Sequence, residues 1–221
     1  MSHWEMDTKS ASRTYRGATV EQRRADRKLL IMEAAIQLYG EVGFRNATVK
    51  AVCERANLTE RYFYESFANS ETLLIAAYTH ITDALFKDMA EASSYHKTED
   101  ARVAAVLRIY FQRIKEQPRA ARVFLLELAG ISGAVDEARS EVLRSMHRIL
   151  LGPLRNDRRK AASDKMSLEA AGMVGALLSI AIRWLSQSCS RPLTEVAHLA
   201  LTFCMTAREL ETPGKRKKGK S

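Results

Sequence analysis

The sequence has few of the residues that interrupt helices. Its 221 residues include only four prolines and ten glycines. The stretches between them are rich in Ala, Leu, Glu and Arg, and β-branched residues do not alternate with polar ones as they do in strands. This scarcity of breakers argues against a sheet-rich fold, and we expect an all-α protein.

Cysteine is also scarce. The three cysteines, Cys53, Cys189 and Cys204, are odd in number and have no Cys-x-x-Cys spacing. That pattern argues against a disulfide framework and against a metal site, so we expect reduced, packed thiols. The N-terminus has no apolar signal core, and no apolar run approaches the ~18 residues that a membrane span requires. We therefore expect a cytoplasmic protein that does not enter a membrane.

Signals of catalysis are missing as well. The sequence has no His-Glu-x-x-His motif, no glycine-rich phosphate loop and no evident Ser-His or Cys-His pairing. We expect no enzyme activity, no catalytic residues, no metal and no cofactor. The five histidines are expected at the surface or in packing: His3, His80, His96, His147 and His198.

Positive charge is present in excess but is unevenly spread. The formal net charge is +9, which favours an anionic partner such as nucleic acid. Residues 1–67 contain 11 Lys and Arg against 9 Asp and Glu, whereas residues 215–221 contain five basic residues and no acidic one. Basic residues also gather near the N-terminus, either as a solvated tail or as an arm that touches DNA. They are Lys9, Arg13, Arg16, Arg23, Arg24, Arg27 and Lys28.

The stretch 46–67 predicts two short helices joined by a tight turn. The first helix is expected over about 49–56 and the second after Thr59, with Asn57 and Leu58 in the turn. Thr48 and Thr59 have the positions of N-cap residues. Leu58 and Phe63 have the spacing of a hydrophobic staple. Asn57 tolerates the left-handed conformation that such a turn needs. The pattern is a helix-turn-helix, whose second helix can enter the DNA major groove.

Further helices surround this motif. Thr19 and Gln22 fit a capping box that starts a long helix, and Gly43 ends it. Its apolar face is predicted to contain Ile31, Ala35, Leu38 and Val42, with Ala34 and Tyr39 beside them. Asn69 or Ser70 caps a fourth helix, which follows the motif without a linker. The remaining helices are expected over about 98–117, 119–129, 134–151, 166–188 and 193–210, with a charged loop over 155–164.

Four segments follow from these elements. We expect a disordered arm over 1–18, a DNA-binding domain over 19–68, a helical domain over 69–211 and a basic disordered tail over 212–221.

A set of residues in 22–75 has a characteristic order and spacing: Ala34-Ala35, Leu38-Tyr39, Gly43-Phe44, Thr48-Val49, Val52 to Ala56, Leu58-Thr59, Phe63-Tyr64, Phe67 and Glu71 to Leu74. In these residues the chain resembles the tetracycline-repressor (TetR) family of bacterial transcriptional regulators. The resemblance implies a three-helix DNA-binding unit and a larger helical ligand-binding domain. The role of the domain over 69–211 in effector binding and dimerisation is implied by this family resemblance of residues 22–75. Two departures stand out. Asn57 replaces the usual turn glycine, and Ala68-Asn69-Ser70 replaces Pro-Ser-Lys, whose lysine can hold a phosphate.

DNA contacts are predicted around both short helices. For the backbone we expect Thr48, Lys50, Arg45 and Ser66, together with Tyr64, whose role is implied by the resemblance. For base edges we expect Thr59, Arg61 and Tyr62. The alternative for Arg61 is a solvated charge on the helix surface, and the alternative for Tyr62 is packing in the core. Glu60 and Glu65 repel phosphate, so they should face away from the backbone or towards a base donor.

One helix-turn-helix touches few bases, so a homodimer on palindromic double-stranded DNA is expected. Small residues on the helix over 166–188 permit another helix to approach closely. Apolar residues on the last two helices supply apolar surface for a dimer interface. The resemblance implies that these helices pair with their copies as a four-helix bundle. The interface candidates are Gly172, Gly175, Ala176, Ser179, Leu199 and Phe203. The alternative is that they serve only the intramolecular core.

The resemblance also implies an effector pocket in the larger domain. Candidate lining residues are Phe86, Met89, Tyr110, Phe111, Phe124, Glu127, Met146, Arg183 and Trp184. An ordinary apolar core is the alternative for most of them. Glu127 and Arg183 interrupt apolar runs, so as buried charges they need partners, or one of them orients a ligand. The mixture of aromatic, methionine and aliphatic side chains among these candidates favours an apolar or aromatic effector.

Together these patterns predict a DNA-binding transcriptional regulator. It is expected to act as a repressor that a small-molecule effector releases from its operator. The alternative is a helical ligand-binding or interaction protein with weak or lost DNA binding.

Overall fold

The computed structural model describes residues 19–151 and 168–211, and this part of the chain is entirely helical. The all-α prediction is confirmed. The helices are α1 Val20–Val42, η2 Phe44–Asn46, α2 Val49–Ala56, α3 Glu60–Ser66, α4 Ser70–Ser94, α5 Glu99–Glu116, α6 Pro118–Leu126, α7 Gly133–Leu151, α8 Leu168–Ser186 and α9 Leu193–Glu211. The predicted arm over 1–18, the loop over 155–164, the start of a helix at 166 and the tail over 212–221 lie outside the described residues.

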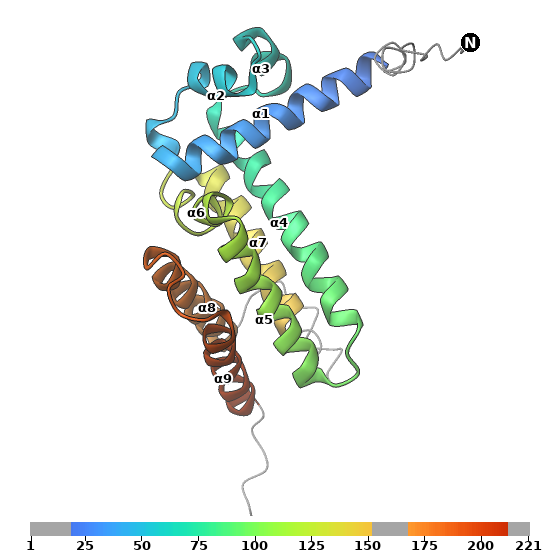
Figure 1. Cartoon of the computed structure of the whole chain (residues 1–221), viewed down its shortest axis with the longest axis vertical. Coiled ribbons are helices and arrows are strands. Elements are labelled where there is room, and N and C mark those ends of the chain that lie inside the picture. Colours follow the sequence, from blue (N-terminus) through green and yellow to red (C-terminus); the bar gives the residue numbers. More distant parts are fainter. Residues whose placement is uncertain (1–18, 152–167, 212–221) are drawn as a thin grey trace, which may run out of the picture.

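The helix-turn-helix forms one end of the molecule (Figure 1). α2 and α3 lie on one side of α1, and α4 leaves from the other side. α4 then runs beside α5 and α7, while α8 and α9 form a pair along the flank of α5 to α7. Among the described residues no helix has the length and apolar character needed to cross a membrane.

Local signals explain most helix ends. Thr19 and Gln22 form both hydrogen bonds of the predicted capping box. Gly43 ends α1 with a positive φ of 86°, a conformation that side chains with a Cβ rarely adopt. The Asn69 side chain accepts from the Thr72 backbone N–H and so caps α4. Pro118 occupies the first turn of α6, where its missing N–H costs nothing.

Two local predictions are wrong. Val42 is 44% exposed in the last turn of α1, although Ile31, Ala35 and Leu38 of the same predicted face are buried. The Thr59 hydroxyl makes no capping hydrogen bond, although the residue does sit at the N-cap of α3. That hydroxyl remains exposed at the start of α3.

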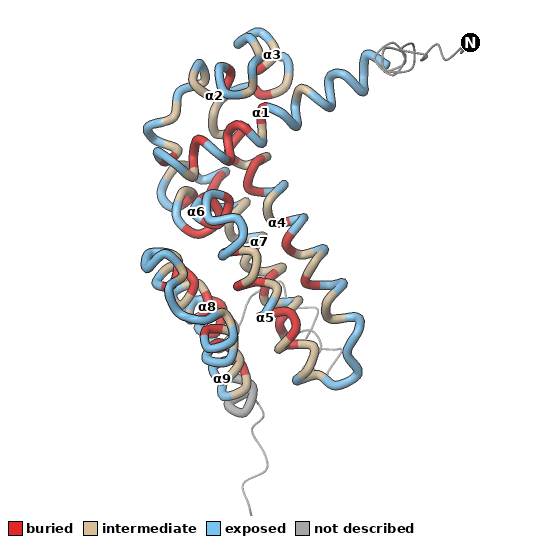
Figure 2. The backbone as a smooth tube through the Cα atoms, in the orientation of Figure 1, coloured by how far each residue is buried: buried red, intermediate tan, exposed pale blue. Residues whose placement is uncertain are grey.

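The core is continuous across the two parts of the molecule. Buried residues from Ile31 in α1 to Cys204 in α9 form one packed cluster, and Figure 2 shows them along the inward faces of the helices. The cysteines fit the expectation of packed thiols, since Cys53 and Cys204 are buried and Cys189 is half-buried. Burial raises the pKa of Cys204 to about 12, so this thiol stays protonated.

Candidate nucleic-acid interface

The turn between α2 and α3 has the geometry that its sequence predicts. Thr48 accepts the backbone N–H of Ala51 at 3.1 Å and caps α2. Asn57 adopts the left-handed conformation, with φ 53° and ψ 43°, which Asn tolerates better than most residues. The rings of Phe63 and Phe67 are buried, and they seat α3 against the core. This packing leaves the opposite face of α3 in solvent.

That outer face carries several of the predicted DNA contacts. Thr59, Arg61 and Tyr64 are exposed, and 84% of the Arg61 side chain is accessible. The Nε of Arg61 donates to Oε1 of Glu65 one turn later, at 3.0 Å. Glu65 therefore holds Arg61 along the helix surface and neutralises part of its charge. Glu60 is exposed on the same helix.

The first turns of α1 hold α3 from the side. Arg24 donates to the backbone carbonyl of Glu65 at 2.7 Å, and the Arg27 guanidinium lies 4.5 Å from the centroid of the Tyr62 ring. Arg27 also approaches the Glu65 carboxylate, at 3.9 Å. Tyr62 is consequently half-buried between α1 and α3. The sequence marked these arginines as basic, but their partners lie about 40 residues away and no local pattern revealed the contact.

The remaining predicted contacts are divided between two places. Lys50 is exposed in the first turn of α2, where only a 4.0 Å approach to Glu54 restrains it. Ser66 is half-buried at the end of α3. Arg45 points the other way, since its guanidinium donates to the carbonyl of Gly130 at 3.0 Å in the connection between α6 and α7. The structure thus gathers Thr48, Lys50, Thr59, Arg61 and Tyr64 on the exposed surface and engages Arg45 with the larger domain.

The other end of α1 is joined to α6 by close packing. A Cβ built on Gly40 would lie 2.5 Å from the Cβ of Arg119, so only glycine permits this approach. The Glu41 carboxylate bridges two arginines, Arg55 of α2 at 2.7 Å and Arg119 of α6 at 3.0 Å. The hydrogen bond from Arg55 holds the pKa of Glu41 below its usual value.

Glu127 forms a second connection at the same junction. Its carboxylate accepts the backbone N–H of Phe44 at 2.8 Å and lies 3.5 Å from Nε of Arg122. The side chain is 14% exposed, so Glu127 is a largely buried charge with partners, which is one of the two alternatives that the sequence left open. The prediction that Arg183 is a buried charge is wrong, because that residue is exposed on α8. Helical periodicity places Arg183 on the outer stripe of α8 together with Gly172, Gly175 and Ser179.

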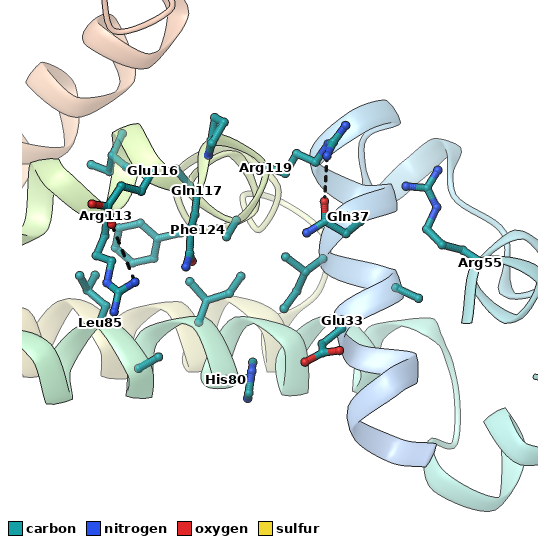
Figure 3. Close-up of a pocket in the computed structure, with 18 of the residues that line it drawn as sticks. Glu33, Gln37, Arg55, His80, Leu85, Arg113, Glu116, Gln117, Arg119 and Phe124 are labelled. Carbon is teal, nitrogen blue, oxygen red and sulfur yellow. Dashed lines mark hydrogen bonds and ion pairs between the residues drawn. The ribbon is translucent and has the colours of Figure 1, made fainter. Parts of the chain in front are cut away.

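A cleft of about 1090 Å³ opens between α1, α4, α5 and α6 (Figure 3). Of the predicted pocket residues, only Tyr110 and Phe124 line it. The others lie elsewhere. Met89, Phe111, Met146 and Trp184 are buried in the core, Phe86 is half-buried, and Glu127 and Arg183 have the positions given above. Aromatic rings contact one another in this core. The ring centroids of Tyr110 and Phe111 are 5.0 Å apart, and those of Phe111 and Trp184 are 5.8 Å apart.

Tyr110 is unusual among the residues of the cleft. Its hydroxyl is buried without a hydrogen-bond partner among the described residues, an arrangement that costs about 1–3 kcal/mol. Burial, reinforced by Tyr78, raises the pKa of Tyr110 and keeps the hydroxyl protonated as a donor. The described residues contain no cluster of His, Cys, Asp and Glu suited to a metal ion.

Comparison with known proteins agrees with the helix-turn-helix geometry of α2 and α3. Residues 31–77 match the family model of "Bacterial regulatory proteins, tetR family". No curated protein matches the chain in sequence.

Several solved structures share the fold at low sequence identity. The fatty acid degradation regulator FadR from Bacillus halodurans is 19% identical with a TM-score of 0.70, over 86% of this chain and 96% of that one. FadR from Bacillus subtilis, solved with stearoyl-CoA, is also 19% identical with a TM-score of 0.70, over 81% and 98%. A TetR family transcription regulator from Marinobacter aquaeolei is 17% identical with a TM-score of 0.64, over 85% and 97%. The resemblance to the TetR family is therefore confirmed, in sequence through residues 31–77 and in fold through most of the chain.

Proposed function

We propose that this protein is a cytoplasmic transcriptional repressor that binds a palindromic operator as a homodimer and leaves it when a small-molecule effector binds. In this proposal residues 19–68 are the DNA-binding domain, and residues 69–211 are the effector-binding and dimerisation domain. The observation that carries the proposal is the exposed face of α3 beside the start of α2, within the region that the family model matches.

The contacts divide into two classes. Thr48, Lys50 and Tyr64 are placed to meet phosphates, with Ser66 and Arg45 as further backbone contacts once DNA rearranges their present surroundings. Thr59, Arg61 and the edge of Tyr62 face the bases. Arg61 can donate bidentately to guanine, because its terminal nitrogens extend beyond the bond that its Nε makes to Glu65.

Titration of operator and random DNA at fixed salt tests the role of Arg61. Arg61→Ala is expected to lose about 1–3 kcal/mol of discrimination at one base pair. Its affinity for random DNA should change less. Equal losses on both DNAs would remove Arg61 from the base-reading set.

The outer faces of α8 and α9 support the dimer. Gly172, Gly175 and Ser179 are exposed in a row on α8, and no atom lies within 4 Å of a Cβ built on either glycine. On α9, Leu199 and Phe203 are 45% and 49% exposed. With the half-buried Ala176, they offer a surface with which a second copy can build a four-helix bundle.

Sedimentation at micromolar concentration tests this interface. Gly175→Arg is expected to give a monomer. Gly133→Arg is the matched control, because that glycine is also exposed with open space around it but begins α7. A wild-type monomer, or a dimer that survives Gly175→Arg, would contradict the proposal.

The effector is proposed to act by a population shift. A ligand that binds better to the form with more widely spaced recognition helices favours that form and lowers operator affinity. Only two residues separate the α3 C-cap at Phe67 from the first residue of α4, Ser70, so α4 transmits the movement directly. Free and liganded structures with the same distance between the two α3 helices would exclude this mechanism.

A helical interaction protein with weak DNA binding is a second candidate. Its support is specific: Arg61 is paired with Glu65, Arg45 is bound to Gly130, and Ser70 stands where related proteins carry a phosphate-binding lysine. Gel shifts with the chain's own upstream region and with genome-wide selected fragments separate the candidates. Failure to bind any fragment at low salt would favour the second.

A further inference from the structure

The cleft described above lies where the DNA-binding domain meets the larger domain. Its walls come from both parts. Glu33, Ile36 and Gln37 belong to α1, whereas His80 and Leu85 belong to α4. α5 and α6 close the remaining side, and Arg55 of α2 reaches the edge. A molecule in this cleft would touch the helix-turn-helix and the helices that support it at the same time.

The interior of the cleft is mainly apolar. Aliphatic side chains from three helices, Ile36, Ile81 and Ile114, face it together with Leu85 and the Phe124 ring. At about 1090 Å³ it is as large as the upper range of small-molecule sites, which are also mostly apolar with a few placed polar groups. An apolar body of extended shape would be removed from water here.

Charge differs between the two ends of the cleft. At the α5 end Arg113 is held by Asp88 and lies 4.0 Å from Glu116, so acidic groups outnumber it. At the α1–α6 end one carboxylate, that of Glu41, serves both Arg55 and Arg119. Glu33 also lines the α1 wall, but the carboxylate that pairs with these two arginines is Glu41 alone, so one positive charge at this end exceeds the carboxylate that the arginines contact.

Arg119 is placed to donate a hydrogen bond to an anion at this end of the cleft. Its side chain is 54% exposed, and its second nitrogen donates only to the neutral amide of Gln37, at 3.1 Å. Figure 3 shows Arg119 and Gln37 together at one mouth of the cleft, with Glu33 and His80 lower on the α1 and α4 walls. An anion that replaced the amide would gain a charge-assisted hydrogen bond.

We propose that this cleft binds a small amphipathic acid, a molecule with an apolar body that lies against Ile36, Leu85 and Phe124 and one anionic group that Arg119 receives. The regulatory consequence rests on the proposed function: a ligand held by α1 and by α4 to α6 changes how the DNA-binding domain is set on the larger domain. Binding itself does not depend on that function.

Calorimetric titration with three twelve-carbon probes tests the head group. Dodecanoate, dodecanol and dodecylammonium have the same apolar chain but an anionic, a neutral and a cationic end. The two ions are used below their micelle concentrations and dodecanol below its solubility limit. The wild-type protein is expected to bind dodecanoate about tenfold more tightly than dodecanol, the ratio that one charge-assisted hydrogen bond supplies. Equal affinities, or no saturable binding of dodecanoate, would overturn the proposal.

Three substitutions test where the ligand binds. Ala84 lines the cleft, whereas Ala90 on the same helix does not, and both are exposed. Ala84→Phe should weaken dodecanoate binding about tenfold by filling space that the chain needs, and Ala90→Phe should bind as the wild type does. Arg119→Gln should weaken dodecanoate and leave dodecanol unchanged, whereas a cleft that had merely been disturbed would lose both.

Unchanged dodecanoate binding by Ala84→Phe would show that the ligand sits elsewhere and would overturn the assignment. Gel shifts without any ligand report separately on DNA binding. A protein that binds dodecanoate in this cleft but no DNA would refute the proposed function alone, and the reverse result would refute the cleft alone.

Discussion

The two ends of α1 hold the helix-turn-helix in different ways. At the N-terminal end, Arg24 and Arg27 reach α3 through a carbonyl, a ring face and a distant carboxylate, all near solvent. At the C-terminal end, Gly40 brings the backbone of α1 against that of Arg119 in α6. Long side chains can follow a moving partner, whereas packed backbones cannot. Phe63 and Phe67 also seat α3 on the core, so we call the N-terminal end adjustable only with respect to these side-chain contacts, and the C-terminal end rigid because backbones pack there.

Gly40→Ala should have the largest effect on stability, since it breaks the rigid end. The added Cβ would overlap backbone atoms of Arg119, and overpacking of this kind costs about 1–3 kcal/mol in the free energy of unfolding. Gly133→Ala is the control. It has open space and should be neutral or stabilising by up to about 1 kcal/mol. Denaturant unfolding measures both, and changes of the same sign would argue against the close packing.

Glu127→Ala tests the second contact at the rigid end. It removes the acceptor of the partly buried Phe44 N–H, and leaving such a donor unpaired costs about 1–3 kcal/mol. Glu127→Gln should lose less, because the amide oxygen still accepts that N–H and only the approach of Arg122 is lost. Urea titrations that give equal losses for the two variants would assign the effect to packing.

Arg27→Ala tests the adjustable end and should cost less. The contact of its guanidinium with the half-buried Tyr62 ring lies near solvent and contributes about 0.5–1 kcal/mol. Arg23→Ala, an exposed neighbour one turn earlier, should stay within about 0.5 kcal/mol of the wild type. If the two variants unfold alike, Arg27 does not hold α3.

Lys50→Ala should leave stability almost unchanged, because its one ion-pair neighbour is 4.0 Å away and both side chains are exposed. Its effect should appear in DNA binding. Loss of one phosphate contact is expected to weaken operator and random DNA together and to reduce the salt slope by about 1. Titration at several salt concentrations gives the slope, and an unchanged value would remove Lys50 from the phosphate contacts.

The sequence predicted the elements better than the contacts between them. Thr48, Asn57 and Gly43 act within a few residues of themselves, so their caps and turns could be read directly and are confirmed. Arg45 and Gly130 are 85 residues apart, and Phe44 and Glu127 are 83 apart. No local pattern specifies such pairs. Arg183 shows the same limit, because an apolar neighbourhood in sequence does not say which side of a helix meets the core.

The unbroken length of α4 has a mechanical consequence. With 25 residues and a rise of 1.5 Å per residue, the helix is about 37 Å long. A tilt of about 5° around its far end would carry its first turn, and α3 beyond it, through about 3 Å. In a symmetric dimer the two displacements add to about 6 Å, against about 34 Å between successive major-groove faces on one side of the duplex. In such a dimer, a rotation that small at one end of α4 is enough to change the spacing of the two α3 helices so that it no longer matches the spacing of the major-groove faces.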